Sequence, residues 1–162
     1  MSQSCLDCAR RSERVFCDLE PGALQEFDGI KSFQTYPRAS VLFREGERAN
    51  SVFLICKGRV RLTVCSESGR RMTLRTAPAG EVLGLSAVLS GGHYEVTAEV
   101  VEAAETAEIP RKELLNFLRE HREVCMQVVN LLSEDLHVAY DRVRAVGLAR
   151  TRHPQLHSAP AH

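Results

Sequence analysis

The apolar residues between about residues 31 and 109 recur at every second position, and glycines interrupt this pattern at short intervals. Val60, Leu62 and Val64, for example, alternate with charged or polar neighbours. Such alternation is typical of β-strands that bury one face, because successive side chains of a strand point to opposite sides of the sheet. Residues 66–69 then provide a hairpin turn with a glycine that can adopt a positive φ. Many short strands joined by such turns predict an antiparallel β-barrel or jelly roll.

Helical periodicity replaces this pattern on both sides of the β region. Before it, residues 19–30 place a proline near a helix start and apolar residues at helical spacing. After it, Pro110 opens a second helical stretch, and a third extends from about Arg122 to Val146. Gly147 stands where a C-cap glycine would end that third helix. We therefore expect a mainly β fold with flanking helices that ends in one long helix.

Length and composition favour a single folded domain. The chain has 162 residues, of which 44% are hydrophobic and 26% charged, and this excludes a disordered protein. Basic and acidic residues balance at 21 each, whereas a non-specific nucleic-acid binder carries a basic excess. Neither a signal peptide nor a membrane-spanning stretch is visible, so we expect a cytoplasmic protein without a membrane partner. We expect four parts, namely a cysteine-rich arm (1–18), a β-roll (19–121), a dimerisation helix (122–148) and a disordered tail (149–162).

The third helical stretch carries an uninterrupted heptad pattern with spacings of 4 and 3 residues in alternation. We name it the seam, and its members are Cys125, Val129, Leu132, Leu136, Ala139, Val143 and Val146. A seam is narrower than an ordinary core-facing stripe, so it predicts a twofold homodimer. A second stripe lies on a neighbouring face and could cover the chain's own barrel; it contains Val124, Val128, Leu131 and Val138. The alternative is that both stripes pack within one chain.

Three runs of the β region, residues 41–47 (VLFREGE), 52–62 (VFLICKGRVRL) and 80–91 (GEVLGLSAVLSG), precede this helix. In this order they resemble the effector domain of the Crp/Fnr family of bacterial transcription regulators. The resemblance implies a cyclic-nucleotide-binding-like double-stranded β-helix, a form of jelly roll, and a homodimer whose long helices are re-aligned by a ligand. It therefore implies a ligand- or redox-sensing effector domain rather than an enzyme.

Complete members of the family continue past the long helix into a winged helix-turn-helix that reads DNA. Here the pattern breaks off after residues 147–150, so we expect no sequence-specific DNA binding by this chain alone. Contact with DNA would need a helix-turn-helix supplied by a longer form or by a partner. A purely structural dimerisation partner with a filled pocket is a further alternative.

The resemblance also implies a ligand pocket. In nucleotide-binding members, a short helix after a glycine binds the cyclic phosphate, a glutamate binds the ribose, and an arginine neutralises the charge. Here Gly84 stands at the glycine, Leu85 replaces the glutamate and Val96 replaces the arginine; no Lys or Arg occurs between Arg75 and Arg111. A cyclic phosphate would lose charge-assisted hydrogen bonds worth about 1.5–3 kcal/mol each, so we expect no response to cAMP.

The candidate pocket, or cassette, consists of Gly84, Leu85, Ser86, Ala87, Val96 and Thr97. Ser86 and Thr97 could contact a neutral or weakly anionic effector through their hydroxyl groups. Alternatively, they are ordinary polar residues that cap a helix and face solvent.

The N-terminal arm contains Cys5, Cys8 and Cys17 in a C-x2-C-x8-C pattern, which suits one metal centre. It resembles the oxygen-sensing branch of the family, which binds an iron–sulfur cluster through such cysteines and one more before the helix that begins with proline. Ala107 occupies that last place here, so the fourth ligand is missing. Two alternatives remain open for the arm: it binds an iron–sulfur cluster or zinc, or its cysteines are free thiols. A stand-alone metal or redox module is accordingly the alternative function.

Three further cysteines could replace the missing ligand, and the β and helical patterns predict their orientation. Cys65 shares a strand face with Arg61 and Thr63, so its thiol is expected to point outward. Cys56 and Cys125 are expected to be small core residues.

Overall fold

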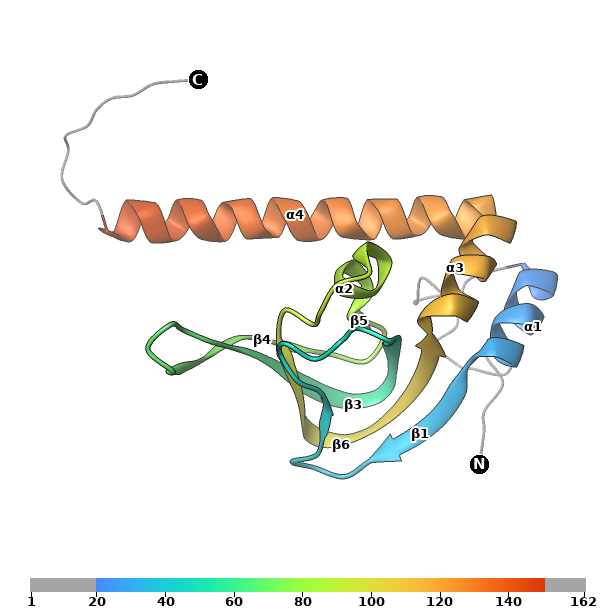
Figure 1. Ribbon diagram of the computed structural model, residues 1–162, viewed down its shortest axis with the longest axis horizontal. Coiled ribbons are helices and arrows are strands. Elements are labelled where there is room, and N and C mark those ends of the chain that lie inside the picture. The colour runs from blue at the N-terminus through green and yellow to red at the C-terminus, as the bar shows by residue number, and fades with distance from the viewer. Residues whose placement is uncertain (1–19, 151–162) are drawn as a thin grey trace, which may run out of the picture. The chain divides into compact units, whose positions relative to one another are not determined.

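The computed structural model describes residues 20–150, with side chains described as far as residue 147 (Figure 1). Its elements, in chain order, are α1 (Pro21–Ile30), β1 (Ser32–Tyr36), β2 (Val41–Phe43), β3 (Ser51–Cys65), β4 (Arg71–Ala77), β5 (Val82–Leu83), α2 (Leu85–Ser90), β6 (Thr97–Pro110), α3 (Arg111–Glu120) and α4 (Arg122–Arg150). The chain divides after Cys125 into two compact units. None of the described helices combines the length and the apolar character that crossing a membrane requires.

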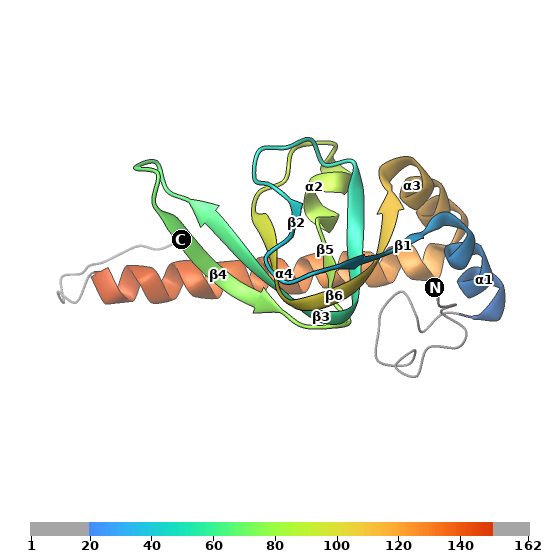
Figure 2. The ribbon, with the colours of Figure 1, turned by 90° about the horizontal axis from the view of Figure 1, so that it is seen from below.

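The strands form one antiparallel sheet around the two longest strands, β3 and β6. Its order is β1-β6-β3-β4, while β2 pairs with β6 and β5 pairs with β3. Both long strands bend strongly, as Figures 1 and 2 show, and their register shifts at three places between Ile55 and Val60. Such bulges let one strand turn a corner, so a single sheet curls into a roll. This arrangement confirms the predicted mainly β jelly roll with flanking helices.

The β3–β4 hairpin turns where the alternating pattern predicts it. Gly69 adopts a φ of 85° and donates its backbone N–H to the carbonyl of Ser66 at 2.9 Å. The Ser66 hydroxyl accepts the backbone N–H of Arg70 at 3.1 Å and so closes the turn a second time. The predicted hairpin at residues 66–69 is therefore confirmed.

The core of the roll extends to α1 and α3, which lie side by side at one end of the sheet (Figure 2). Phe27 of α1 and Phe117 of α3 are buried, and their ring centroids lie 5.6 Å apart. Tilted aromatic pairs of this kind add about 0.5–1.5 kcal/mol to the stabilisation from burial. Helices expected within residues 19–30 and after Pro110 are thus present. Pro110 itself is the last residue of β6 and the N-cap of α3.

Complementary charges follow the outer face of the two central strands. Basic residues of β3 lie opposite acidic residues of β6, and their ion pairs are Lys57–Glu105, Arg59–Glu102 and Arg61–Glu99 at 3.6, 3.1 and 2.9 Å. A register slip by one residue would break all three pairs and would turn the buried face outward. The ladder therefore favours this register.

The second unit is described here by its helix alone. The prediction that Gly147 caps α4 is wrong, because the helix continues through this residue to Arg150. A glycine inside a helix costs about 1 kcal/mol relative to alanine but does not by itself end the helix. The cysteine-rich arm, residues 1–18, lies outside the described residues, and so does the predicted tail from residue 151 onward.

Candidate ligand site

The cassette begins with a left-handed glycine turn. Gly84 follows β5 as the N-cap of α2 and adopts a φ of 84°, and its carbonyl accepts the N–H of Val88 at 2.9 Å in the first turn of α2. A Cβ atom at Gly84 would lie 2.9 Å from Cε1 of Tyr94, closer than real Cβ contacts allow. Only glycine therefore satisfies both the backbone conformation and the close approach of the ring.

Tyr94 holds this turn against the sheet. Its buried ring stacks on Phe43, with centroids 3.9 Å apart and planes 17° apart. Its hydroxyl donates to the carbonyl of Ser51 at 2.5 Å and accepts the backbone N–H of Ser51 at 3.2 Å. Burial raises the pKa of the Tyr94 hydroxyl, so this group stays protonated and remains a donor at neutral pH.

Arg111 binds the other end of the cassette helix. Its Nε donates to the carbonyl of Val88 at 2.8 Å, and its backbone N–H donates to the carbonyl of Asn50 at 2.7 Å. A cation at a helix C-terminus is favourable because the unsatisfied carbonyls carry partial negative charge. The first residue of α3 is thus fixed to the last turn of α2. The sequence analysis did not predict this contact between Arg111 and α2. The only sequence signal for it is the arginine that directly follows Pro110.

The predicted cassette residues differ in exposure. Leu85 and Ala87 are 6% and 3% exposed, so their side chains belong to the core, whereas Ser86 is exposed and Val96 is half-buried. A ligand at this turn would therefore meet mainly backbone groups of the first turn of α2. The assignment of these residues to a ligand pocket stays a prediction.

Both arginines that flank the cassette in sequence already have partners. Arg75 forms a two-pronged ion pair with Glu81, with both N···O distances 2.7 Å, and Arg111 binds the end of α2 that lies away from Gly84. A bidentate pair of this kind fixes the guanidinium group in place. Residues 76–110 contain no lysine or arginine. The segment that forms the cassette turn therefore contributes no lysine or arginine.

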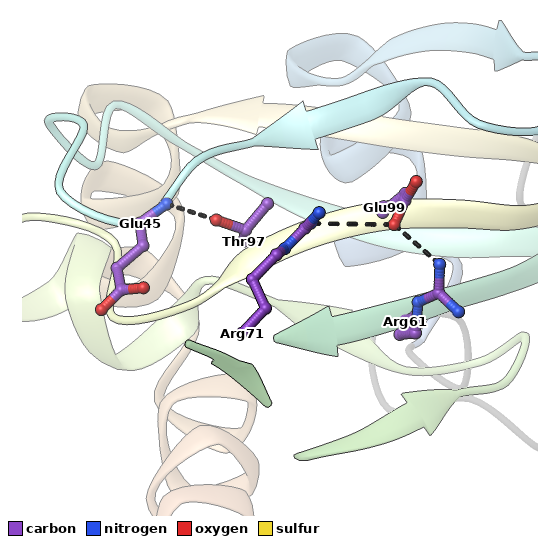
Figure 3. Close-up of polar contacts among 5 residues, drawn as sticks. All are labelled: Glu45, Arg61, Arg71, Thr97 and Glu99. Atoms are coloured by element: carbon purple, nitrogen blue, oxygen red, sulfur yellow. Dashed lines mark hydrogen bonds and ion pairs between the residues drawn. The ribbon is translucent and has the colours of Figure 1, made fainter. Parts of the chain in front are cut away.

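The hydroxyl of Thr97 takes part in a link between the loop after β2 and the sheet. This hydroxyl accepts the backbone N–H of Glu45 at 2.9 Å (Figure 3). The Glu45 carboxylate in turn accepts the backbone N–H of Cys65 at 2.9 Å. Thr97 is half-buried at the start of β6 and caps no helix. The expectation of a solvent-facing helix cap is wrong for this residue, because its hydroxyl joins the loop after β2 to the sheet.

Glu99 lies beside Thr97 on β6 and meets two arginines. Arg61 of β3 binds its carboxylate at 2.9 Å, and Arg71 of β4 approaches the same oxygen at 3.8 Å (Figure 3). The hydrogen bond from Arg61 is the main reason why the pKa of Glu99 is lowered below its usual value of about 4.5. The cluster therefore stays ionised at neutral pH and joins three strands.

The described cysteines partly match their predicted orientation. Cys65 is exposed, as predicted, whereas Cys56 and Cys125 are half-buried rather than core residues. The bulge between Ile55 and Lys57 breaks the alternation on which the prediction for Cys56 depends. Ala107, at the place of the missing ligand, is fully buried in β6. Cys5, Cys8 and Cys17 lie outside the described residues.

Comparison with known proteins gives consistent results. The cyclic nucleotide-binding domain family matches residues 33–121. The chain is 25% identical over 140 residues to the transcriptional activatory protein AadR of Rhodopseudomonas palustris, which covers 86% of this chain and 57% of AadR. It is 25% identical over 143 residues to the nitrogen fixation regulation protein FixK of Bradyrhizobium diazoefficiens, covering 88% of this chain and 59% of FixK. The chain thus spans less than two thirds of the length of these relatives.

Among solved structures, the catabolite activator protein of Thermus thermophilus superposes with a TM-score of 0.77 at 24% identity, covering 85% of this chain and 65% of that protein. This likeness shows the fold. The family match covers more than half of the chain, and the curated relatives are named as regulators, in agreement with the Crp/Fnr resemblance. From these matches and the cassette geometry, we conclude that the chain belongs to the cyclic nucleotide-binding domain family.

Proposed function

We propose that this domain is the effector-sensing part of a Crp/Fnr-type transcription regulator and that its effector is not a cyclic nucleotide. One observation supports the ligand class. The cassette retains the left-handed glycine and the short helix, but Val96 stands where nucleotide-binding relatives use an arginine, and the flanking arginines bind Glu81 and Val88. The cassette thus has the backbone conformation of a ligand-binding turn, but it lacks the arginine that would neutralise a bound phosphate.

The energetic balance disfavours a cyclic phosphate at this turn. Charge-assisted hydrogen bonds contribute about 1.5–3 kcal/mol each, and a buried anion without them also loses its hydration. The N–H groups at one helix end return at most about 2 kcal/mol. A neutral or weakly anionic effector avoids this loss. Such a molecule would use the backbone N–H groups after Gly84 and the exposed hydroxyl of Ser86.

Thermal unfolding of the full chain with cAMP and with cGMP tests the ligand class. A nucleotide present at 100 times its Kd would stabilise the fold by about 2.7 kcal/mol and would raise Tm by several degrees. We expect a shift below about 1 °C with millimolar cAMP or cGMP. A saturable rise in Tm, reproduced by calorimetric titration, would contradict the proposed ligand class.

Dimerisation through the seam of α4 is the second part of the proposal. Several seam residues expose large apolar side chains along one helix, namely Val129, Leu136, Val143 and Val146, at 46%, 52%, 71% and 55%. Burying each of them stabilises by roughly 1.5–3 kcal/mol, which supports a partner helix with the same seam. Ala139 is exposed, and Cys125 and Leu132 are half-buried. A homodimer would let an effector change the relation of two long helices.

Arg111 provides a path from the cassette toward these helices within the first unit. Arg111 binds the end of α2 and is the first residue of α3. The C-cap of α3 is His121, and its carbonyl accepts the N–H of Cys125 in the first turn of α4 at 3.1 Å. A shift of α2 would therefore act on α3 directly. Contact with DNA through a helix-turn-helix supplied by a longer form or by a partner is part of this proposal.

The alternative function is a metal or redox module that uses Cys5, Cys8 and Cys17. Three thiolates in a C-x2-C-x8-C pattern favour an iron–sulfur cluster or zinc with a fourth ligand from elsewhere. Anaerobic purification with iron, sulfide and zinc analysis tests it, with the triple Cys→Ser variant as the comparison. Metal that is present in the native chain and lost in the variant supports the alternative. A colourless, metal-free native chain rules it out.

A further inference from the structure

We propose that Glu26, Glu120 and His121 form a binding site for a first-row divalent cation where α1 meets the end of α3. One carboxylate oxygen of each glutamate and one ring nitrogen of the histidine lie within 4.8 Å of one another. Glu26 comes from α1, whereas the other two residues end α3. All three residues of the site belong to the first unit, and none of them is a cassette or seam residue.

The surrounding core fixes the direction of the imidazole. His121 is the C-cap of α3, and its backbone N–H donates to the carbonyl of Phe117 at 3.0 Å. Its ring lies 4.6 Å from the ring of Phe117, which in turn packs against Phe27 of α1. Nε2 of His121 therefore points at α1 and lies 2.6 Å from the carboxylate of Glu26. The histidine is only 20% exposed, so its position is well constrained.

The charges where α1 meets the end of α3 favour a divalent cation. The two carboxylates carry a formal charge of −2, which one divalent ion balances. Nearby cations have other contacts, since Lys31 binds Asp28 at 2.9 Å and Arg119 binds Asn116 at 3.2 Å. Among the described residues, Glu120 forms no ion pair with a basic side chain within 4.0 Å. Metal binding would therefore replace repulsion between the two glutamates by attraction.

The donor set and its geometry suit such an ion after small side-chain movements. Nitrogen and oxygen ligands bind zinc at about 2.0–2.2 Å, which places tetrahedral donors roughly 3.4 Å apart. The Glu26–His121 contact must therefore lengthen from 2.6 Å, and the Glu120 carboxylate lies within 4.8 Å of both groups. Both glutamates are exposed, so rotations of their side chains suffice. Carboxylate ligands together with one imidazole suit Mn²⁺ and Zn²⁺ and leave further positions for water.

Mn²⁺ is a suitable probe, because oxygen ligands favour it and thiolate ligands favour softer metals, so the N-terminal cysteines interfere little. We expect sub-stoichiometric Mn²⁺ added to the full ¹⁵N-labelled chain to broaden amide signals of residues around 26 and 117–121 before any others. We also expect Zn²⁺ or Mn²⁺ to raise Tm. If the amide signals of residues around 26 and 117–121 are not broadened, the proposal is overturned.

The isosteric double variant Glu26→Gln/Glu120→Gln removes both carboxylates and retains the shape of the side chains. We expect its Mn²⁺ affinity to fall at least tenfold, whereas Glu123→Gln, an exposed change in the first turn of α4, leaves the affinity within twofold. Tm without metal measures folding separately, and loss of the two charges is not expected to lower it. Equal Mn²⁺ affinity in the double variant and the native chain would overturn the proposal.

Discussion

Nε of Arg111 donates a hydrogen bond to the carbonyl of Val88 at 2.8 Å, across 23 residues of sequence. This contact joins the last turn of the cassette helix to the first turn of α3. Gly91 next to it turns the chain out of α2 with a φ of 74° and lets the guanidinium group approach closely. The end of the cassette helix is thus held by a cation that comes from α3.

Replacing Arg111 with methionine is expected to lower the free energy of unfolding by about 1–2 kcal/mol. The variant leaves the carbonyl of the buried residue Val88 without its charged donor, and such bonds contribute about 1.5–3 kcal/mol when well shielded. Urea unfolding measures the change. Arg119→Met is the matched control, because Arg119 binds only the exposed Asn116 side chain among the contacts described, and we expect a change within about 0.5 kcal/mol. Equal effects of the two substitutions would contradict a specific role of Arg111.

Gly84→Ala is expected to destabilise the fold more than Gly69→Ala. Both glycines have a φ near 85°, so both alanine variants pay the cost of about 1–2 kcal/mol for a left-handed residue. At Gly69 nothing lies within 4 Å of the added Cβ, whereas at Gly84 the Tyr94 ring lies at 2.9 Å. The difference between the two variants in urea unfolding therefore measures the clash with Tyr94. Equal destabilisation would mean that the ring moves away freely.

The double substitution Leu85→Glu/Val96→Arg is expected to create a response to cAMP. It introduces a glutamate and an arginine at the two places where the Crp/Fnr resemblance puts those of the nucleotide-binding members. The new arginine could contribute about 1.5–3 kcal/mol to phosphate binding, a gain of roughly 10- to 100-fold in affinity. The readout is a cAMP-dependent rise in Tm, compared with Val96→Lys as a cation without the planar guanidinium fork. Because Leu85 is buried, Val96→Arg alone is the second variant if the double variant fails to fold. If cAMP raises the Tm of none of the folded variants, the absence of an arginine at residue 96 does not explain why the domain would not bind cyclic nucleotides.

Glu99 gives the stability a defined pH dependence. Its pKa is lower in the folded state than in the unfolded chain, chiefly through Arg61, so its stabilising contribution is complete above the usual pKa of about 4.5. That contribution is lost as the pH falls through the lowered folded-state value. We expect Glu99→Gln to reduce the free energy of unfolding by up to about 1 kcal/mol at pH 7 and by less below pH 3. In an Arg61→Met background most of this pH-dependent difference should disappear, and a difference that grows toward low pH would contradict the assignment.

Local patterns account for most of the fold, and their failures have physical causes. The alternation of Val60 and Leu62 predicts β3 because both residues are buried on one face of a half-exposed strand. The end of α4 could not be predicted from Gly147, since a glycine caps a helix only where the chain adopts a left-handed turn, and here it stays helical. Cys56 lies at a bulge, where alternation fails.

The sites depend on contacts that no local pattern contains. Glu26 and His121 are 95 residues apart and meet only because Phe27 and Phe117 bring α1 and α3 together. Arg111 and Val88 are likewise distant in sequence, 23 residues apart, and come into contact where the cassette helix lies against α3. The glycine at residue 84 and the substitution of Val96 for arginine, in contrast, could be identified from the sequence, because the resemblance aligns them with a known motif.

We propose that this effector domain acts as a dimer through the seam of α4, and sedimentation equilibrium of the full chain at high micromolar concentration tests this dimer most directly. We expect a particle of two chains of 18.1 kDa each. Val143→Glu on the seam should convert it to one chain, whereas Val138→Glu, an exposed valine of the same helix outside the seam, should leave two chains together. A native chain that sediments as one subunit of 18.1 kDa at these concentrations would contradict the account.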